Sequence, residues 1–79
     1  MKFRKFSPLD RKYPIFELVG QDGGPYLDIS KNDQGVIEIC FTGNIISEVF
    51  EYGLFEAYLK EGLTLAKSSV ETGFEGYNK

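Results

Sequence analysis

Three acidic residues stand between apolar neighbours in short segments, and their spacing decides which chemistry they can do. Glu17 lies within YPIFELVG, Asp28 within YLDIS and Glu38 within VIEICFT. Successive side chains of a β-strand point to opposite faces of the sheet, so each carboxylate points away from the apolar residues beside it. Neighbouring strands would therefore bring Glu17, Asp28 and Glu38 onto one open face.

Carboxylates that lie close together can act as a general acid and base when burial separates their pKa values. The chain has no histidine and one cysteine, Cys40, so the commonest base, the usual zinc ligands and an activated thiolate are not expected. Asp22, Asp28 and Asp33 do not have the spacing of a calcium-binding loop. The sequence therefore predicts no catalytic residue, no cofactor and no metal site. Cys40 is expected to be a small buried hydrophobic residue.

A row of carboxylates on an open face also suits a basic protein partner. Like charges directly opposite each other destabilise a sheet, so two interpretations are open: an ordinary solvated face, or a row retained for a partner. Tyrosine is enriched among the residues that dominate binding energy at protein interfaces. The candidate partner-binding residues are Glu17, Asp28, Glu38, Glu48, Tyr26 and Tyr52.

Charge is unevenly distributed along the 79 residues, whose formal net charge is −3. Residues 1–12 carry five bases and one acid (net +4), whereas residues 13–79 carry four bases and eleven acids (net −7). Nucleic acid requires a positive surface, so the acidic body favours a basic protein partner instead. The basic residues 1–12 form either an edge strand or a solvated arm, and phosphate binding by them is the weaker alternative.

Alternating apolar residues predict two β-hairpins. Residues 26–31 and 36–42 are joined by a turn over residues 31–35, in which Gly35 is free to adopt a positive φ. Residues 13–20 form the preceding strand, because the Gly- and Pro-rich residues after them are typical of a turn. The side chains expected on the face that holds the helix are Phe16, Leu18, Leu27, Ile29, Ile37, Ile39 and Phe41.

Residues 44–52 are dense in β-branched and aromatic side chains, which predicts a fourth strand; an early start of the helix is the alternative. Apolar residues then recur every three or four positions, which predicts an amphipathic helix. Gly62 costs roughly 1 kcal/mol relative to alanine inside a helix, so we expect it where the helix packs closely on the sheet. The expected divisions of a single domain, residues 1–79, are an arm or edge strand over 1–12, a sheet over 13–52, a helix over 53–72 and a tail over 73–79.

The predicted fold class is therefore α+β: a three- to four-stranded antiparallel β-meander with one C-terminal helix packed on one face. A hydrophobic content of 42% with 15% aromatic residues indicates a folded chain. No segment reaches the roughly 20 apolar residues of a membrane-spanning helix, and the first residues lack the apolar run of a signal peptide. The expected location is the cytoplasm.

The order of these features resembles small immunity proteins, which neutralise toxins in bacterial contact-dependent and polymorphic toxin systems. The resemblance spans roughly residues 13–70 and is carried by residues 27–30 (LDIS), 35–39 (GVIEI) and 59–66 (LKEGLTLA). It implies tight, non-catalytic binding to a cognate toxin, often a nuclease with a basic cleft. It implies no functional motif that can be assigned to individual residues.

The leading hypothesis is thus an acidic protein-binding module of the immunity-protein type, a monomer or homodimer that binds neither nucleic acid nor membrane. The alternative is a self-assembling domain that forms a homodimer through a sheet edge, because an unpaired edge strand invites pairing. A third hypothesis, a small-ligand or enzymatic role, requires a concave pocket with converging polar groups.

Overall fold

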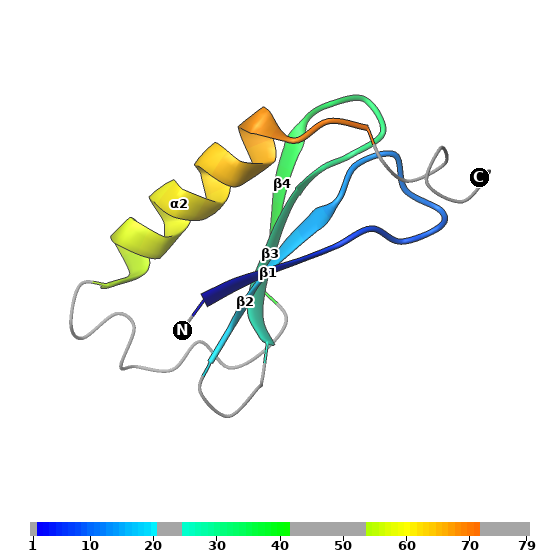
Figure 1. Ribbon diagram of the computed structural model, residues 1–79. Helices are drawn as coiled ribbons and strands as arrows, with labels where there is room; N and C mark the ends of the chain where they lie inside the picture. The colour runs from blue at the N-terminus through cyan, green and yellow to red at the C-terminus, as the bar shows by residue number, and fades with distance from the viewer. Residues whose placement is uncertain (1, 21–24, 42–53, 72–79) are drawn as a thin grey trace.

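The computed structural model describes residues 2–20, 25–41 and 54–71, and these residues form one sheet and one helix (Figure 1). The sheet has the order β1-β2-β3-β4, and every neighbouring pair is antiparallel. The helix packs on one face of it, which confirms the predicted α+β class. The elements are β1 (Lys2–Phe6), β2 (Ile15–Val19), β3 (Pro25–Lys31), β4 (Ile37–Phe41) and α2 (Leu54–Ser68).

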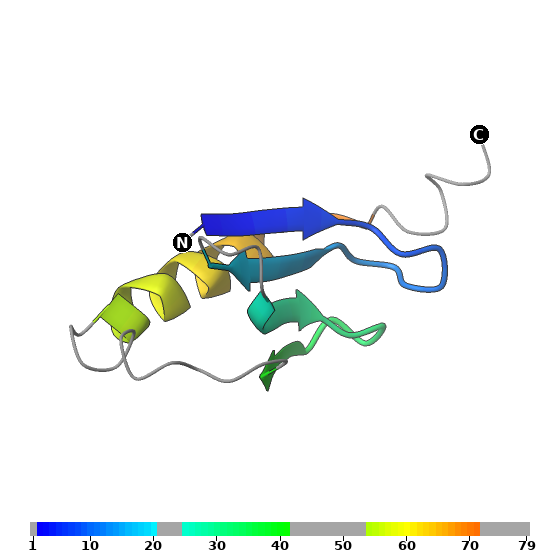
Figure 2. The ribbon, with the colours of Figure 1, turned by 90° about the horizontal axis from the view of Figure 1, so that it is seen from below.

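The basic N-terminal segment is an edge strand and not a solvated arm. β1 pairs with β2 so that Lys2 lies opposite Val19 and Phe6 lies opposite Ile15. Viewed from below, the strands follow one another from blue β1 at one edge to green β4 at the other (Figure 2). The strand that brings the described sheet to four strands is therefore the N-terminal one, β1. The strand predicted over residues 44–52 lies outside the described residues.

The turn between β3 and β4 is organised by one asparagine. The Asn32 side-chain oxygen accepts hydrogen bonds from the backbone N–H groups of Gln34 (2.9 Å) and Val36 (3.0 Å). The Asn32 backbone N–H donates to the carbonyl of Val36 (2.8 Å). Gly35 has a φ of 81°, as predicted, which glycine adopts without a Cβ penalty. This network fixes the register of the hairpin.

The core lies between α2 and the two central strands. Phe16 and Leu18 of β2 and Leu27 and Ile29 of β3 are buried against Ala66 of the helix. α2 packs closest here at Gly62: a Cβ added to this residue would overlap Ile29 Cδ1 and lie 2.8 Å from Phe3 Cζ. The expected close approach of the helix at Gly62 is thus confirmed.

The helix covers less of the sheet than the sequence predicts, because it lies mainly over β2 and β3. Ile37 of β4 packs against the core as expected. Ile39 and Phe41 share a face with Ile29 and Leu27, but they are 41% and 54% exposed, so they are less buried than the sequence predicts. Cys40, on the opposite face of the same edge strand, is also exposed, so its predicted burial is wrong.

The helix ends at Ser68, earlier than the predicted boundary at residue 72. The Ser69 hydroxyl and backbone N–H both donate to the carbonyl of Ala66, at 2.6 and 3.2 Å, which satisfies one of the last helical acceptors. Lys31, at the end of β3, donates from Nζ to the Ser69 carbonyl (3.1 Å). The same Nζ lies 5.0 Å from the centroid of the Tyr13 ring, so one side chain of β3 contacts both the segment after the helix and the connection that leads into β2.

Candidate functional site

The register of the sheet brings four side chains into one row on the face opposite the helix. Arg4 lies opposite Glu17, Glu17 opposite Asp28, and Asp28 opposite Cys40. Two of the carboxylates singled out from the sequence are therefore direct cross-strand neighbours. Glu38 is not in this row, because it lies opposite Ser30, two residues further along β3.

Glu17 is occupied by a residue of its own chain. An Arg4 guanidinium nitrogen, Nη2, forms an ion pair with Glu17 Oε1. The Glu17 side chain is only 13% exposed, whereas that of Arg4 is 59% exposed. At this position the surface therefore presents the arginine, and Glu17 does not offer an unpaired carboxylate to a basic partner.

Asp28 is half-buried, and its surroundings disfavour the ionised form of its carboxyl group. Burial, and then the neighbouring charge of Glu17, raise the pKa of Asp28 above its ordinary value of 3.8, while Arg11 acts in the opposite direction. Among the described residues, Asp28 Oδ1 has no hydrogen-bond partner. The ionised carboxylate of Asp28 is thus disfavoured at this position in the sheet. The side chain is half-buried, so it does not offer an exposed carboxylate to a partner.

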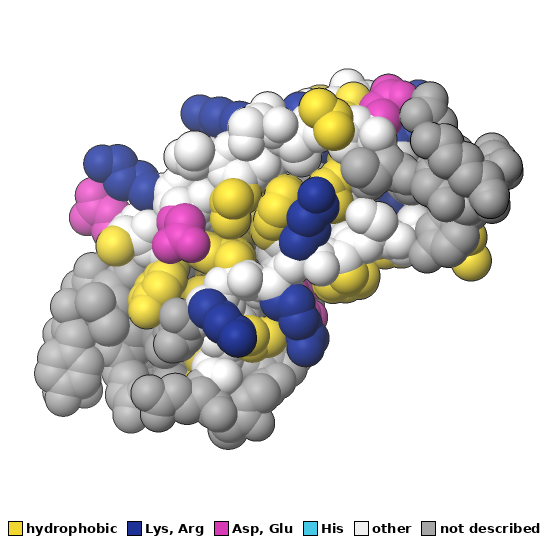
Figure 3. Space-filling view, in the orientation of Figure 1, with side chains coloured by type: hydrophobic (Ala, Val, Ile, Leu, Met, Phe, Trp, Pro, Cys, Tyr) yellow, Lys and Arg dark blue, Asp and Glu magenta, His cyan; other side chains and the backbone are white. Residues whose placement is uncertain are grey.

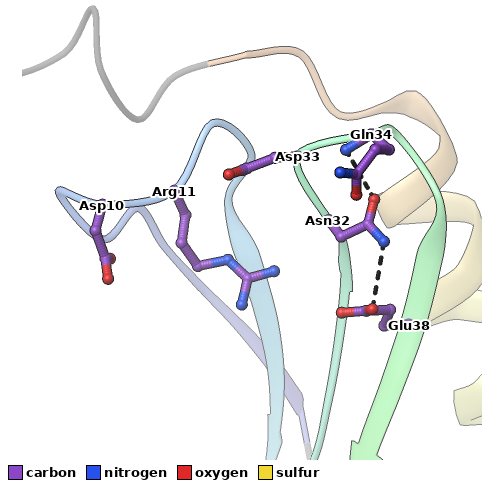
Figure 4. A pocket seen from close by; sticks show the side chains of 6 residues that line it. All are labelled: Asp10, Arg11, Asn32, Asp33, Gln34 and Glu38. Atoms are coloured by element: carbon purple, nitrogen blue, oxygen red, sulfur yellow. Dashed lines mark hydrogen bonds between the residues drawn. The ribbon is translucent and has the colours of Figure 1, made fainter.

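Glu38 lies at the end of the sheet, where the chain forms an open hollow of about 400 Å³. Its Oε2 accepts a hydrogen bond from Asn32 Nδ2 (3.3 Å) (Figure 4). We call this feature the acidic hollow. Its lining residues are Asp10, Arg11, Asn32, Asp33, Gln34 and Glu38.

Three carboxylates of the acidic hollow come from three different segments. Asp10 lies in the connection between β1 and β2, Asp33 in the β3–β4 turn and Glu38 on β4, and all three are exposed. The backbone N–H of Lys12 donates to Asp33 Oδ1 at 3.4 Å, which joins the first two segments.

Arg11 is the single cation in the lining, and it is turned toward β3. Its Nη2 donates to Ser30 Oγ (3.1 Å) and to the carbonyl of Lys31 (3.2 Å), and Figure 4 shows the guanidinium pointing along the strands beneath the turn. No carboxylate of the described residues forms an ion pair with it. The side chain fixes the loop onto the sheet and leaves the hollow with an excess of negative charge.

This arrangement can attract a cationic group, but it does not form a metal centre. Within residues 2–20, 25–41 and 54–71, no three histidine, cysteine or acidic side chains are placed so that they could hold a metal ion. The hollow is lined by polar and charged side chains, unlike the mainly apolar pockets that enclose small ligands. A basic side chain on the surface of another protein fits this chemistry.

The remaining candidates do not contribute to the hollow. Tyr26 is half-buried and packs on the core, with its ring and hydroxyl against Gly20, where a Cβ would overlap the hydroxyl oxygen. Glu48 and Tyr52 lie outside the described residues. The structure thus brings only Glu38 of the six candidates to the acidic hollow.

Sequence reasoning missed Asp10 and Asp33, and it missed the cations that occupy the open face. The alternation of basic and aromatic residues in the first six positions is itself a strand pattern. Pairing that segment with the next strand would have placed Arg4 near Glu17. No local pattern relates Asp10 to Asp33, because a contact between two loops depends on the register of the whole sheet.

The described part of the chain contains no helix long and apolar enough to cross a membrane. Comparison of the chain with family models, with curated proteins and with solved structures finds no significant match.

Proposed function

We propose that this protein is a non-catalytic protein-binding module whose acidic hollow receives a basic side chain of a partner protein. The observation that carries the proposal is the convergence of Asp10, Asp33 and Glu38 from three segments around one open hollow. Their carboxylates are exposed, so a lysine or arginine can reach them without a large desolvation cost.

Charge complementarity of this kind acts on encounter and selectivity more than on affinity. Opposite charges steer two proteins together and exclude wrong partners, and the effect weakens as salt is added. The net charge of −7 over residues 13–79 extends the attraction beyond the hollow itself. A partner with a basic surface is therefore favoured over an acidic one and over nucleic acid.

The proposed surface differs from the one expected on the sequence alone. The centre of the open face is occupied by the Arg4–Glu17 ion pair and the half-buried Asp28, so binding moves to the end of the sheet. The resemblance to immunity proteins makes a toxin with a basic surface the partner class that we propose. The location that we propose for this role is the cytoplasm.

A defined cationic probe gives the first test. We expect hexa-arginine, added to the ¹⁵N-labelled protein, to shift the amide resonances of residues 10–11 and 33–38. Hexa-glutamate at the same ionic strength should leave them in place, since the hollow would repel it. Shifts spread evenly over the acidic residues of α2 would instead indicate non-specific attraction and overturn the proposal.

Titration calorimetry against the purified product of the adjacent gene tests the partner class. The double variant Asp33→Asn/Glu38→Gln should bind at least about tenfold more weakly, a loss of roughly 1.4 kcal/mol. The matched control is Glu56→Gln/Glu61→Gln, which removes the same charge from exposed positions of α2. Equal losses in the two double variants would mean that net charge, and not the acidic hollow, determines binding.

A further inference from the structure

We propose that β1 is a docking surface for an anionic lipid bilayer, which its basic side chains and one aromatic ring contact together. The surface consists of Lys2, Arg4, Lys5 and Phe6, all of which are exposed, and we call it the basic edge. The proposal rests on these side chains and not on free backbone groups of the strand. It is also independent of the function proposed for the acidic hollow.

Most of the positive charge of the basic edge is not neutralised within the described part of the chain. Three of the five residues of β1 are bases and none is an acid. Among the described residues, neither Lys2 nor Lys5 forms an ion pair or a side-chain hydrogen bond. Arg4 pairs with Glu17, but its side chain is 59% exposed, so part of the guanidinium still faces water. Two unpaired cations and one partly shared cation are thus available to an anionic partner.

The basic side chains project to both sides of the strand. Arg4 lies opposite Glu17 on the open face, whereas Lys5 lies opposite Phe16 on the face that holds the helix. With β1 toward the viewer, Figure 3 shows Lys and Arg side chains above and below the strand. Side chains on opposite faces of one strand do not line a common groove of the kind that holds single-stranded nucleic acid. Long basic side chains can instead bend from both faces toward one plane, which a bilayer surface provides.

Phe6 adds an apolar contact to the basic edge. Its side chain is 41% exposed, and by the alternation of the strand it shares the open face with Lys2 and Arg4. Bases that attract anionic lipid, together with an aromatic ring that leaves water for the headgroup region, are the two contributions that hold amphipathic surfaces on a membrane. The combination of Phe6 with its basic neighbours therefore favours a bilayer over an acidic protein segment.

The fold keeps an acidic residue of the hollow away from a bilayer that contacts β1. Glu38 lies on β4, at the opposite edge of the described sheet. Three strand spacings separate the two edges by about 14 Å, which exceeds the Debye length of about 8 Å at physiological ionic strength. Glu17, the cross-strand neighbour of Arg4, is only 13% exposed and is already paired. The chain can therefore dock through β1 although its net charge is −3.

Co-sedimentation with vesicles tests the charge contribution. We expect the wild type to bind vesicles of phosphatidylcholine and phosphatidylserine in equal parts, and not vesicles of phosphatidylcholine alone. Lys2→Gln/Lys5→Gln should bind about 25-fold more weakly, since each base near an anionic surface contributes roughly fivefold. The matched control is Lys60→Gln/Lys67→Gln, which removes the same charge from exposed positions of α2 and should bind nearly as the wild type does. Circular dichroism verifies that both variants fold.

Two results of this assay would overturn the proposal. One is a wild type that does not bind the phosphatidylserine vesicles, and the other is an equal loss of binding in the two double variants. A wild type that binds a single-stranded DNA oligonucleotide but no vesicle would assign the basic edge to nucleic acid, and this too contradicts the proposal.

A fluorescent reporter tests the contact of Phe6 with lipid. The chain has no tryptophan, so Phe6→Trp introduces a single indole into the basic edge. We expect its emission to shift to the blue when phosphatidylserine vesicles are added. Val70→Trp, at a 69% exposed position after α2, is the control and should not shift. Equal shifts in the two variants would mean that the chain does not dock through β1. Neither assay contains a basic protein, so failure here leaves the function proposed for the acidic hollow untouched.

Discussion

Glu17 and Asp28 lie directly opposite each other on β2 and β3, and only Glu17 is paired with an arginine. Arg4 neutralises Glu17 from β1, while the Arg11 Nη2 is engaged by Ser30 and Lys31 and only partly offsets the charge around Asp28. The repulsion between the two carboxylates therefore mainly destabilises the ionised form of Asp28. This asymmetry has consequences for stability that can be measured.

Asp28→Asn should stabilise the protein at pH 7, by about 0.2–1 kcal/mol, the range of a cross-strand pair. The pKa of Asp28 is raised in the folded state, so the folded protein binds this proton more tightly than the unfolded chain does. The wild type should therefore lose stability as the pH rises from the ordinary value of 3.8 through the raised one, and Asp28→Asn should lack that loss. Urea unfolding at a series of pH values measures both effects.

The matched control for this pH dependence is Asp33→Asn, which removes an exposed carboxylate. Its stability should follow the wild-type profile over the same pH range. If Asp28→Asn and Asp33→Asn have the same profile, the repulsion assigned to Asp28 is wrong.

Arg4→Gln should destabilise the sheet by about 0.5–1 kcal/mol, because it leaves Glu17 and Asp28 opposite each other without their cation. The loss should shrink in an Asp28→Asn background, where the second charge is absent. A double-mutant cycle from thermal or urea unfolding measures this coupling. Lys2→Gln, an exposed change on the same strand that lies opposite Val19, is the control and should cost little. Additive effects of Arg4→Gln and Asp28→Asn would show that the three side chains do not act as a unit.

Gly62→Ala should destabilise the protein by about 1–3 kcal/mol, the usual cost of overpacking, although alanine is the better helix former by roughly 1 kcal/mol. The new Cβ would overlap Ile29 Cδ1 and crowd Phe3. Glu61→Ala, an exposed neighbour on the same helix, should be close to neutral. Ile29→Val removes the overlapping methyl group, so the double variant should lose less stability than the sum of the single ones. Strict additivity in urea unfolding would place the helix further from the sheet than the structure does.

The hairpins and the apolar face were predictable because each depends on a local pattern. Alternation around Asp28 and Glu38 fixed the strands, and the turn residues fixed the positive φ at Gly35. The interruption of the helical pattern at Gly62 also had a physical meaning that could be interpreted without coordinates. These features require only the neighbours in sequence.

Two features were not predictable from local patterns: how much of the sheet the helix covers, and which charged side chains form ion pairs. An apolar stripe shows which face of a helix is buried, but not how many strands that helix covers, so Ile39 and Cys40 were assigned to the wrong environment. Whether Glu17 forms an ion pair depended on whether the segment that contains Arg4 pairs with the sheet. Both questions are settled by tertiary packing, which overrides local preference.

Lys31 connects the end of the helix to the strand end that carries the acidic hollow, so the helix helps to hold the hollow in its binding geometry. Its Nζ binds the Ser69 carbonyl beyond the end of α2 and lies over the Tyr13 ring, and the next residue along the chain is Asn32, which orients Glu38. Any displacement of the last helical turn would therefore loosen the strand end from which the hollow is built. Rigidity at the end of the helix therefore lowers the entropic cost of binding at the acidic hollow.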